Sequence, residues 1–220
     1  RARRVVVRLD DTAVMFHSTN VRVRTRTSVR EGRFAWVAFG PRTRGTVNGV
    51  PVRPGLVLTA EPGAEVGFVS DAGWESITFL LSAQELAAQL AARRRETEIR
   101  LPRDVEMLRL EPERSRRLFG WGKRLAEVAA RHPARFDEGR PERVAAQAEL
   151  LEILLSTVGV AEGLEPSHVD RSRQAQSLVV RRAEEFALAN TGENLHVGEL
   201  CRAAGASVLS AGGVRSRWAL

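Results

Sequence analysis

The side chains best suited to metal binding or nucleophilic catalysis are few and scattered in this chain of 220 residues. The four histidines, His17, His132, His168 and His196, have no Cys, His, Asp or Glu neighbour at the spacing that protein metal sites use. Cys201 is the single cysteine, and its position on the apolar stripe of a short predicted helix favours a role as a small core residue. We therefore expect no metal and no cofactor.

Carboxylates and nucleophile motifs give no catalytic arrangement either. Nothing in the sequence places two of Glu61, Glu65 and Glu75 around a common pocket as an acid and base pair. The chain has no glycine-rich phosphate loop, no Gly-x-Ser-x-Gly elbow and no Cys/His nucleophile pattern. We expect that the protein is not an enzyme and has no catalytic residues. A metal-free enzyme is the distant alternative.

The charge of the chain favours an acidic partner. Its formal net charge is +7, and clustered cations release counterions from a nucleic-acid backbone. Only Lys123 among the 34 basic residues is a lysine, so a general bias toward arginine is the other explanation. Eight arginines and two aspartates lie in residues 1–30. Among them, Arg22, Arg24 and Arg26 share one strand face, which would bind an acidic effector or DNA, or form a solvated surface.

Length and composition indicate an ordinary globular protein. Hydrophobic residues make up 43% and charged residues 28% of the chain, which excludes disordered and collagen-like classes. No run reaches the roughly 18 to 20 apolar residues that cross a bilayer, and the first residues lack the apolar stretch of a signal peptide. We expect a soluble, cytoplasmic protein with no membrane partner.

From Val21 to about Leu81 the sequence is typical of short strands broken by turns. Apolar residues and threonines alternate with arginines up to Arg30, which predicts one apolar and one cationic strand face. The later strand-sized segments, 34–39, 56–59, 66–69 and 77–80, are separated by turn signals such as Asn48-Gly49 and Pro54-Gly55. This pattern predicts a small β-barrel or sandwich.

Three aromatic residues of the segment 34–39 are the candidate effector-binding residues. Phe34, Trp36 and Phe39 would line a pocket inside the barrel, where aromatic surface and a few polar groups hold a small molecule. Ordinary core packing is the other interpretation of each of them.

Helical periodicity begins at Ser82. The spacing of Ser82 and Glu85 predicts a capping box and a helix to about Arg94. A second helix is predicted from near Pro112 to Ala130, with an apolar stripe formed by Leu118, Trp121, Leu125 and Val128. A third is predicted from Pro141 to about Val158, where the apolar stripe repeats every ~3.5 residues, as in helices packed side by side. Its residues are Val144, Ala148, Leu151, Leu155 and Val158.

A linker and two further helices complete the chain. Residues 159–167 contain two glycines and Pro166, which favours a linker. A long helix is predicted from Val169 to Asn190, and Thr191-Gly192 stops it. A short helix is predicted from about Val197 to Ala204, ending at Gly205.

The segment from Arg171 to Ser207 resembles the opening of an AraC/XylS-family DNA-binding domain. The likeness includes a long first helix containing 177–180, the Leu195-His196-Val197 entry, the 200–204 helix and the Gly205-Ala206-Ser207 turn. Ala203-Ala204 lets two helices approach closely, and Gly205 allows a tight turn before a recognition helix. The resemblance implies that DNA is a partner and that Arg202 and Ser207 contact it.

Residues 16 to about 158 look like the sensing half of the same family, a cupin-like barrel followed by dimerising helices. The segments that carry this likeness are 16–19, 47–49, 61–65 and 71–75. It implies an α+β protein with a β-rich sensor in 1–82, a helical dimerisation region in 83–160 and a partial helix-turn-helix domain in 167–220. The expected partners are an unidentified small-molecule effector and a second copy of the chain. The homodimer contact is expected at Val144, Leu151, Leu155 and Val158.

After Ser207 the sequence departs from the family. The family continues with a recognition helix and then a second helix-turn-helix. In this chain Gly212-Gly213 would lie inside the recognition helix, and the residues from there to Leu220 do not match the family. Each glycine would cost a helix about 0.8 to 1 kcal/mol relative to alanine. We expect that a frameshift or truncation has replaced the end of the protein, and that the chain binds DNA weakly and without sequence specificity. The alternative is a stand-alone module that binds a small molecule and dimerises without binding DNA.

Overall fold

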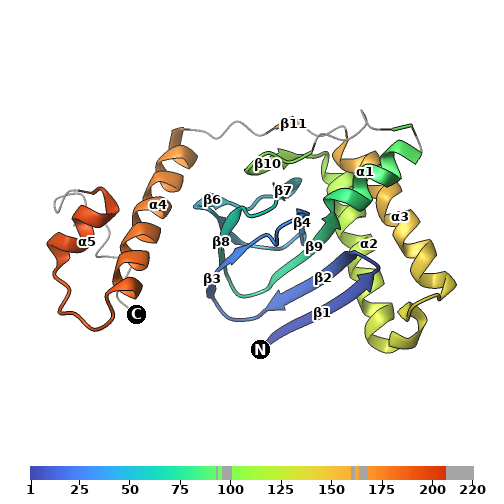
Figure 1. The fold of residues 1–220 in the computed structure, drawn as a ribbon, viewed down its shortest axis with the longest axis horizontal. Helices are drawn as coiled ribbons and strands as arrows, with labels where there is room; N and C mark the ends of the chain where they lie inside the picture. The colour runs from blue at the N-terminus through green and yellow to red at the C-terminus, as the bar shows by residue number, and fades with distance from the viewer. Residues whose placement is uncertain (93, 96–100, 160–161, 164–167, 207–220) are drawn as a thin grey trace. The chain divides into compact units, whose positions relative to one another are not determined.

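The computed structural model describes residues 1–92, 94–95, 101–159, 162–163 and 168–206. The chain forms two compact units, whose elements are labelled in Figure 1. The first comprises Arg1–Val47 and Pro51–Glu165, and the second comprises Asn48–Val50 and Pro166–Leu220. The expected DNA-contacting Ser207 and the expected departure from the family after it lie outside the described residues.

The larger sheet of the first unit has the strand order β1-β2-β9-β4-β7-β10-β11. The described pairings between its neighbours are antiparallel. Side chains alternate across each strand, so every strand contributes a row of side chains to both faces of the sheet. The bounds of the strands in this order are Ala2–Leu9, Thr12–Thr19, Trp74–Ser82, Arg33–Phe39, Leu56–Ala60, Val105–Arg109 and Glu162–Gly163.

The smaller sheet has the order β3-β8-β5-β6, with bounds Val23–Ser28, Glu65–Ser70, Gly45–Val47 and Val50–Pro51. The two sheets share a hydrophobic cluster that includes Val37 and Leu58 from the larger sheet and Val47 and Val66 from the smaller one. The fold class is therefore α+β with antiparallel sheets. The prediction of a closed barrel is wrong, because β1 and β3 are edge strands of separate sheets and a closed barrel would require these edges to pair.

Helices cover the opposite face of the larger sheet and share one hydrophobic cluster with it (Figure 1). They are α1 (Ala83–Ala92), α2 (Pro112–Arg131) and α3 (Pro141–Val158), with the short 3-10 helix η1 (Pro133–Phe136) before α3. The predicted cap of α1 is present, since the Glu85 N–H donates to Ser82 Oγ at 3.4 Å. The predicted stripe of α2 is buried at Leu118, Trp121 and Leu125, whereas its fourth member, Val128, is exposed.

Helix α2 lies very close to strand β9 at Gly122. A Cβ atom at this position would lie 2.5 Å from Ile77 Cγ2 and 3.1 Å from Phe79 Cζ. The optimal separation of non-bonded carbon atoms is about 3.5 to 4.0 Å. The absence of a side chain at Gly122 therefore allows the helix backbone to reach the sheet.

The described part of the second unit contains two helices, α4 (His168–Ala189) and α5 (Val197–Ala204). Both lie within two residues of their predicted bounds. After α4, the Asn190 side chain donates from Nδ2 to the Phe186 carbonyl at 2.7 Å, and a turn follows. Helices α4 and α5 contact each other, and Cys201 and Ala204 of α5 are buried. Small side chains at these positions allow α5 to approach its neighbour closely.

Candidate functional site

Helix α5 is closed at both ends by local hydrogen bonds. At its start the His196 N–H donates to Glu199 Oε2 at 2.9 Å, which is one half of a capping box. At its end Gly205 has a left-handed conformation with φ 67°, and its N–H donates to the Arg202 carbonyl at 3.1 Å. The chain therefore turns sharply after α5, as the glycine predicted.

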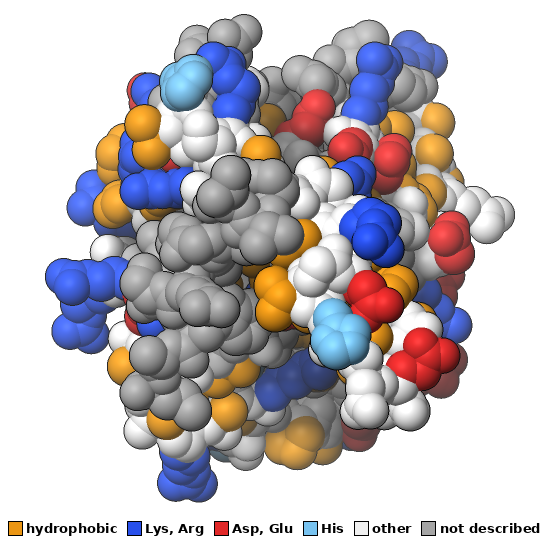
Figure 2. Space-filling model, turned by 90° about the vertical axis from the view of Figure 1, so that its left-hand side faces the viewer, with side chains coloured by type: hydrophobic (Ala, Val, Ile, Leu, Met, Phe, Trp, Pro, Cys, Tyr) orange, Lys and Arg blue, Asp and Glu red, His pale blue; other side chains and the backbone are white. Residues whose placement is uncertain are grey.

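Arg202 lies in the last turn of α5, and its side chain is exposed. The described part of the second unit, residues 168–206, contains five arginines and five Asp or Glu residues. Figure 2 shows the face that lies at the left of Figure 1, and acidic as well as basic side chains are present among its described residues. Arg202 is therefore available to a phosphate, but residues 168–206 have no excess of positive charge to attract DNA.

The three aromatic residues that were expected to line an effector pocket do not lie together. Phe34 and Trp36 project toward the helices, with ring centroids 6.0 Å apart, and Trp36 is fully buried there. Phe39 projects to the opposite face, into the cluster between the sheets, where its ring lies 5.5 Å from that of Trp74. The alternation of side chains along a strand explains the split, because 34 and 36 share a parity that 39 does not.

The face of the larger sheet that meets the smaller sheet, its inner face, is covered over only part of its width. Val37 and Leu58 on the central strands β4 and β7 are buried in the cluster between the sheets. Toward β1 the same face becomes exposed or half-buried. We name this uncovered part the open inner face; its residues are Arg4, Val6 and Arg8 of β1, Met15 and His17 of β2, and Thr78 and Leu80 of β9.

The edge strand β3 of the smaller sheet has exposed side chains on the side that faces the larger sheet. Thr25 and Thr27 are paired with Phe68 and Val66, so all four side chains point to the same side of the smaller sheet. Phe68 and Val66 belong to the cluster between the sheets, whereas both threonines are exposed. The apolar face expected of this strand is therefore not buried.

Arg4 and His17 are neighbours on the open inner face. The strand register places them opposite each other, and Arg4 Nη2 lies 3.1 Å from Met15 Sδ, so the guanidinium extends over β2. Burial lowers the pKa of His17, and the positive charge of Arg4 lowers it further. A neutral imidazole offers one hydrogen-bond donor and one acceptor. Sequence reasoning missed this group because no strand was predicted before Val21, although the run from Val5 to Val7 is a strand signal.

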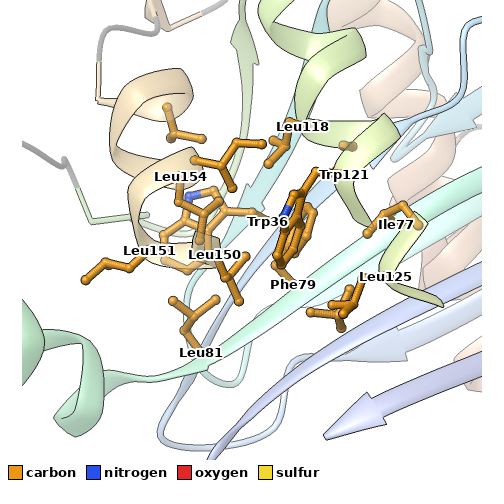
Figure 3. Packing of buried hydrophobic residues seen from close by; sticks show 14 of the residues in the cluster. Trp36, Ile77, Phe79, Leu81, Leu118, Trp121, Leu125, Leu150, Leu151 and Leu154 are labelled. Atoms are coloured by element: carbon orange, nitrogen blue, oxygen red, sulfur yellow. The ribbon is translucent and has the colours of Figure 1, made fainter. Parts of the chain in front are cut away.

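The stripe of α3 that was expected to form a homodimer lies mostly within the chain's own core. Three of its four predicted contact residues are buried in the cluster under the helices: Leu151, Leu155 and Val158. Figure 3 shows their neighbours Leu150 and Leu154 beside Trp36 of the sheet. Val144 is 60% exposed. Packing within one chain explains the spacing of the stripe, so the stripe is not evidence for a dimer.

Two partly enclosed carboxylates have structural partners. Lys123 Nζ lies 2.8 and 3.0 Å from the two oxygens of Glu75 and stands over the rings of Phe16 and Phe119. This ion pair joins α2 to β9 on the helix side of the sheet, away from the open inner face. Glu75 therefore does not supply an acid or base to the space between the sheets.

Glu85 connects the first helix to the rest of the unit. Its carboxylate accepts hydrogen bonds from Thr12 Oγ1, at 3.3 Å, and from Gln147 Nε2. Burial raises the pKa of Glu85; the bond from Thr12 opposes this shift, and the nearby Asp11 and Asp10 add to it. These contacts hold α1, α3 and the β1–β2 turn together.

Two kinds of feature are absent from the described residues. Within them, no group of three or more His, Cys, Asp or Glu side chains is arranged to hold a metal ion. Their helices include none that is both long and apolar enough to cross a bilayer. Cys201 is a free, buried thiol.

Comparison with known proteins gives matches among solved structures. No family model and no curated protein matches the chain. The chain is similar to the AraC-like transcriptional activator CuxR, with a TM-score of 0.49 and 16% identity over 94% of this chain and 70% of that one. It is also similar to ToxT from Vibrio cholerae, with a TM-score of 0.38 and 7% identity over 100% of this chain and 77% of that one. These TM-scores and identities are too low to transfer a function, so a functional conclusion must come from the residues of this chain.

Proposed function

We propose that this chain senses a small molecule and regulates transcription in the manner of AraC-type proteins. In this proposal the first unit is the sensor, and α4 and α5 are the opening helices of a DNA-binding module. The resemblance of the segment from Arg171 to Ser207 to that module supports the assignment, as does the β-rich unit that precedes it. The proposal assigns no reaction to the chain.

One observation carries the proposal. The segment with the family-like sequence folds as a long helix, a turn, a short helix and a left-handed Gly205, in a unit distinct from the strands. This is the arrangement that a helix-turn-helix motif requires before its recognition helix. The same residues in an extended conformation, or merged into the core of the sheets, would have removed the basis for a DNA-binding role.

The contact with DNA in this proposal is made to the phosphate backbone. Arg202 is exposed at the end of α5 and would pair with a phosphate, and Ser207 would donate to the backbone just after the turn. Phosphate contacts position a protein on DNA without reading its sequence. Because residues 168–206 have balanced charge, we expect weak binding that depends strongly on salt.

The sensor would act by a shift between conformations. An effector changes the equilibrium of a regulator only if it binds one conformation more tightly than the other. The space between the sheets supports a binding role because it joins an apolar cluster, with Phe39 and Trp74, to the polar and charged groups of the open inner face. Ligand pockets in proteins typically combine these two kinds of surface.

A homodimer remains part of the proposal. Of the four residues assigned to its contact, Val144 is the one whose exposure allows it to touch a second copy. Leu151, Leu155 and Val158 would support the interface indirectly, by holding α3 on its own sheet.

DNA binding through α5 is tested by fluorescence anisotropy of a labelled duplex at about 50 and about 200 mM salt. We expect measurable binding at the lower salt that is largely lost at the higher. The substitution Arg202→Ala should weaken binding and reduce the slope of log K against log salt by about 0.9, the value for one lost phosphate contact. The matched control is Arg3→Ala, which removes an exposed arginine from β1 and should leave binding unchanged.

Two results would contradict the proposal. The first is no binding by the unaltered chain at the lower salt. The second is equal weakening by Arg202→Ala and Arg3→Ala, because binding would then depend on overall charge and not on α5. Enrichment of a defined sequence from a random duplex library would instead disprove the expectation of unspecific binding while supporting the regulator role.

A stand-alone ligand-binding module is the second candidate. The balanced charge of residues 168–206 favours it, since DNA-binding surfaces are usually strongly basic. It shares the sensor of the first proposal and differs in lacking DNA affinity. The anisotropy titration therefore separates the two.

A further inference from the structure

The open inner face has no described structural partner over its β1 side. Val6 is 47% exposed, and Arg4 and Arg8 on either side of it are exposed. The register puts Val6 beside Met15 and Met15 beside Thr78, so this surface continues without a break into the half-buried part of the sheet. It is therefore an apolar surface with cations at its outer margin.

The charges of this face have one sign. By the alternation of side chains along the strands, the inner face of the larger sheet carries Arg4 and Arg8 on β1, Arg33 on β4 and Arg109 on β10. On the inner side, strands β1, β2, β9, β4 and β7 of the larger sheet and β3, β8 and β5 of the smaller one carry no Asp or Glu. Glu75 and Glu106 belong to the opposite face of the larger sheet. An anion at the open inner face therefore meets cations and no carboxylate from these strands.

The two arginines of β1 are placed to act on one group. They are four residues apart on the same face of a strand, so their Cα atoms are separated by about 13 Å. Two long side chains can close this distance over Val6. Neither Arg4 nor Arg8 forms an ion pair with a described residue, and the Arg4 guanidinium already extends over the face to Met15. Arginine is well suited to bind carboxylate or phosphate groups in a bidentate manner.

Protection of the sheet edge does not account for this arrangement. Charged residues on an edge strand discourage pairing with another chain, and Arg3 on the helix side of β1 serves that purpose equally well. Edge protection gives no reason for the open inner face to lack carboxylates or for Val6 to be exposed between two arginines. A ligand that is both acidic and apolar gives a reason for both.

We propose that the open inner face binds a small molecule with one anionic group and an apolar body. Arg4 and Arg8 hold the carboxylate or phosphate, Val6, Met15 and Leu80 contact the apolar body, and His17 and Thr78 offer hydrogen bonds. The inference rests on the proposed sensor function only in giving this ligand the role of effector. Binding itself does not depend on DNA.

Isothermal titration calorimetry of the whole chain with 4-phenylbutyrate tests the proposal. The neutral analogue 4-phenylbutyramide has the same apolar body, and inorganic phosphate has the charge without that body. We expect saturable binding of phenylbutyrate, and binding of the other two that is weaker by at least about tenfold. This order distinguishes an acidic apolar ligand from a purely apolar one and from a free anion.

The variant Arg4→Gln/Arg8→Gln should weaken phenylbutyrate binding by at least about tenfold. Its matched control is Arg3→Gln/Arg22→Gln, which changes the net charge equally at exposed positions outside the open inner face and should change the affinity by less than about twofold. Both pairs are exposed, so the urea unfolding midpoint should stay the same in both variants.

Several outcomes would overturn the proposal. They are no binding of phenylbutyrate at millimolar concentration, equal binding of phenylbutyrate and its amide, and equal weakening by the two double variants. The proposal is also overturned if Arg4→Gln/Arg8→Gln shifts the equilibrium between monomer and dimer and the control does not. The open inner face would then bind a second copy of the chain. Binding of phenylbutyrate without binding of DNA would support this inference and contradict the regulator role. Binding of DNA without binding of phenylbutyrate would contradict this inference and support the regulator role.

Discussion

The substitution Gly122→Ala tests the close approach of α2 to the sheet. Alanine favours a helix over glycine by about 0.8 to 1 kcal/mol. Here, however, the new methyl group would lie 2.5 Å from Ile77 Cγ2 and 3.1 Å from Phe79 Cζ. Ile77 and Phe79 are fully buried side chains that have no space to move away. Overpacking of this kind costs about 1 to 3 kcal/mol. We expect the overpacking to outweigh the helix propensity and to lower the free energy of unfolding by up to about 2 kcal/mol.

The matched control is Gly120→Ala on the same helix. A Cβ there would meet only the terminal nitrogen of the Arg124 side chain, at 3.4 Å, so the variant should gain up to about 1 kcal/mol from helix propensity. The two variants should then differ by about 2 kcal/mol, or by about 1 M in urea midpoint for a slope of about 2 kcal/mol/M. Tryptophan fluorescence follows the transition, because Trp36, Trp74 and Trp121 are buried in this unit. Equal midpoints for the two variants would refute the close approach.

Two further predictions concern pH and assembly. Because the pKa of His17 is lowered below its ordinary value of 6.5, the unfolded chain binds this proton more readily, so stability should be complete above about pH 6.5 and decrease as the pH falls below it. Urea unfolding gives the free energy of unfolding at about pH 7 and about pH 5, and this free energy should fall less between the two pH values in His17→Gln than in the unaltered chain. An identical fall in both proteins would disprove the effect assigned to His17. For assembly, Val144→Asp should reduce dimer in sedimentation velocity without loss of stability, whereas Leu151→Ala should cost about 2 to 5 kcal/mol of stability and leave the association unchanged. An unaltered chain that sediments as a monomer would disprove the homodimer.

Turn residues account for the strands that the sequence predicted correctly. Strands β4, β7, β8 and β9 are each bounded by a Gly, Pro or Asn turn, and the structure has a strand at each of these places. The β1–β2 hairpin has no such signal, because its turn is formed by Asp10 and Asp11, with φ 54° at Asp10. Strand β2 is also buried on both faces over much of its length, so it shows no alternation of apolar and polar residues. The first two strands were therefore missed.

The missing strands also explain the interpretation of α3. A periodic apolar stripe shows that a helix buries one side, but it does not identify the surface that covers it. In the structure α3 and α2 both contact β1, and the buried leucines of α3 belong to that cluster. Without β1 no covering surface within the chain was identified for the stripe from Leu151 to Val158, and its spacing together with the resemblance to dimerising helices led to the prediction of a second copy. The same gap hid Arg4, Val6 and His17 from the list of candidate site residues.

The position of the arginines decides which acidic partner the net charge favours. Counterion release strengthens binding only where the cations lie at the nucleic-acid surface, and residues 168–206 carry as many carboxylates as arginines. The excess is concentrated in the first 30 residues, where arginines outnumber aspartates by eight to two. Two of these arginines, Arg4 and Arg8, belong to the open inner face, whose residues include no carboxylate. The arginine excess of the first 30 residues is therefore consistent with the acidic ligand proposed for the open inner face, and weak DNA binding in the anisotropy titration would be consistent with the balanced charge of residues 168–206.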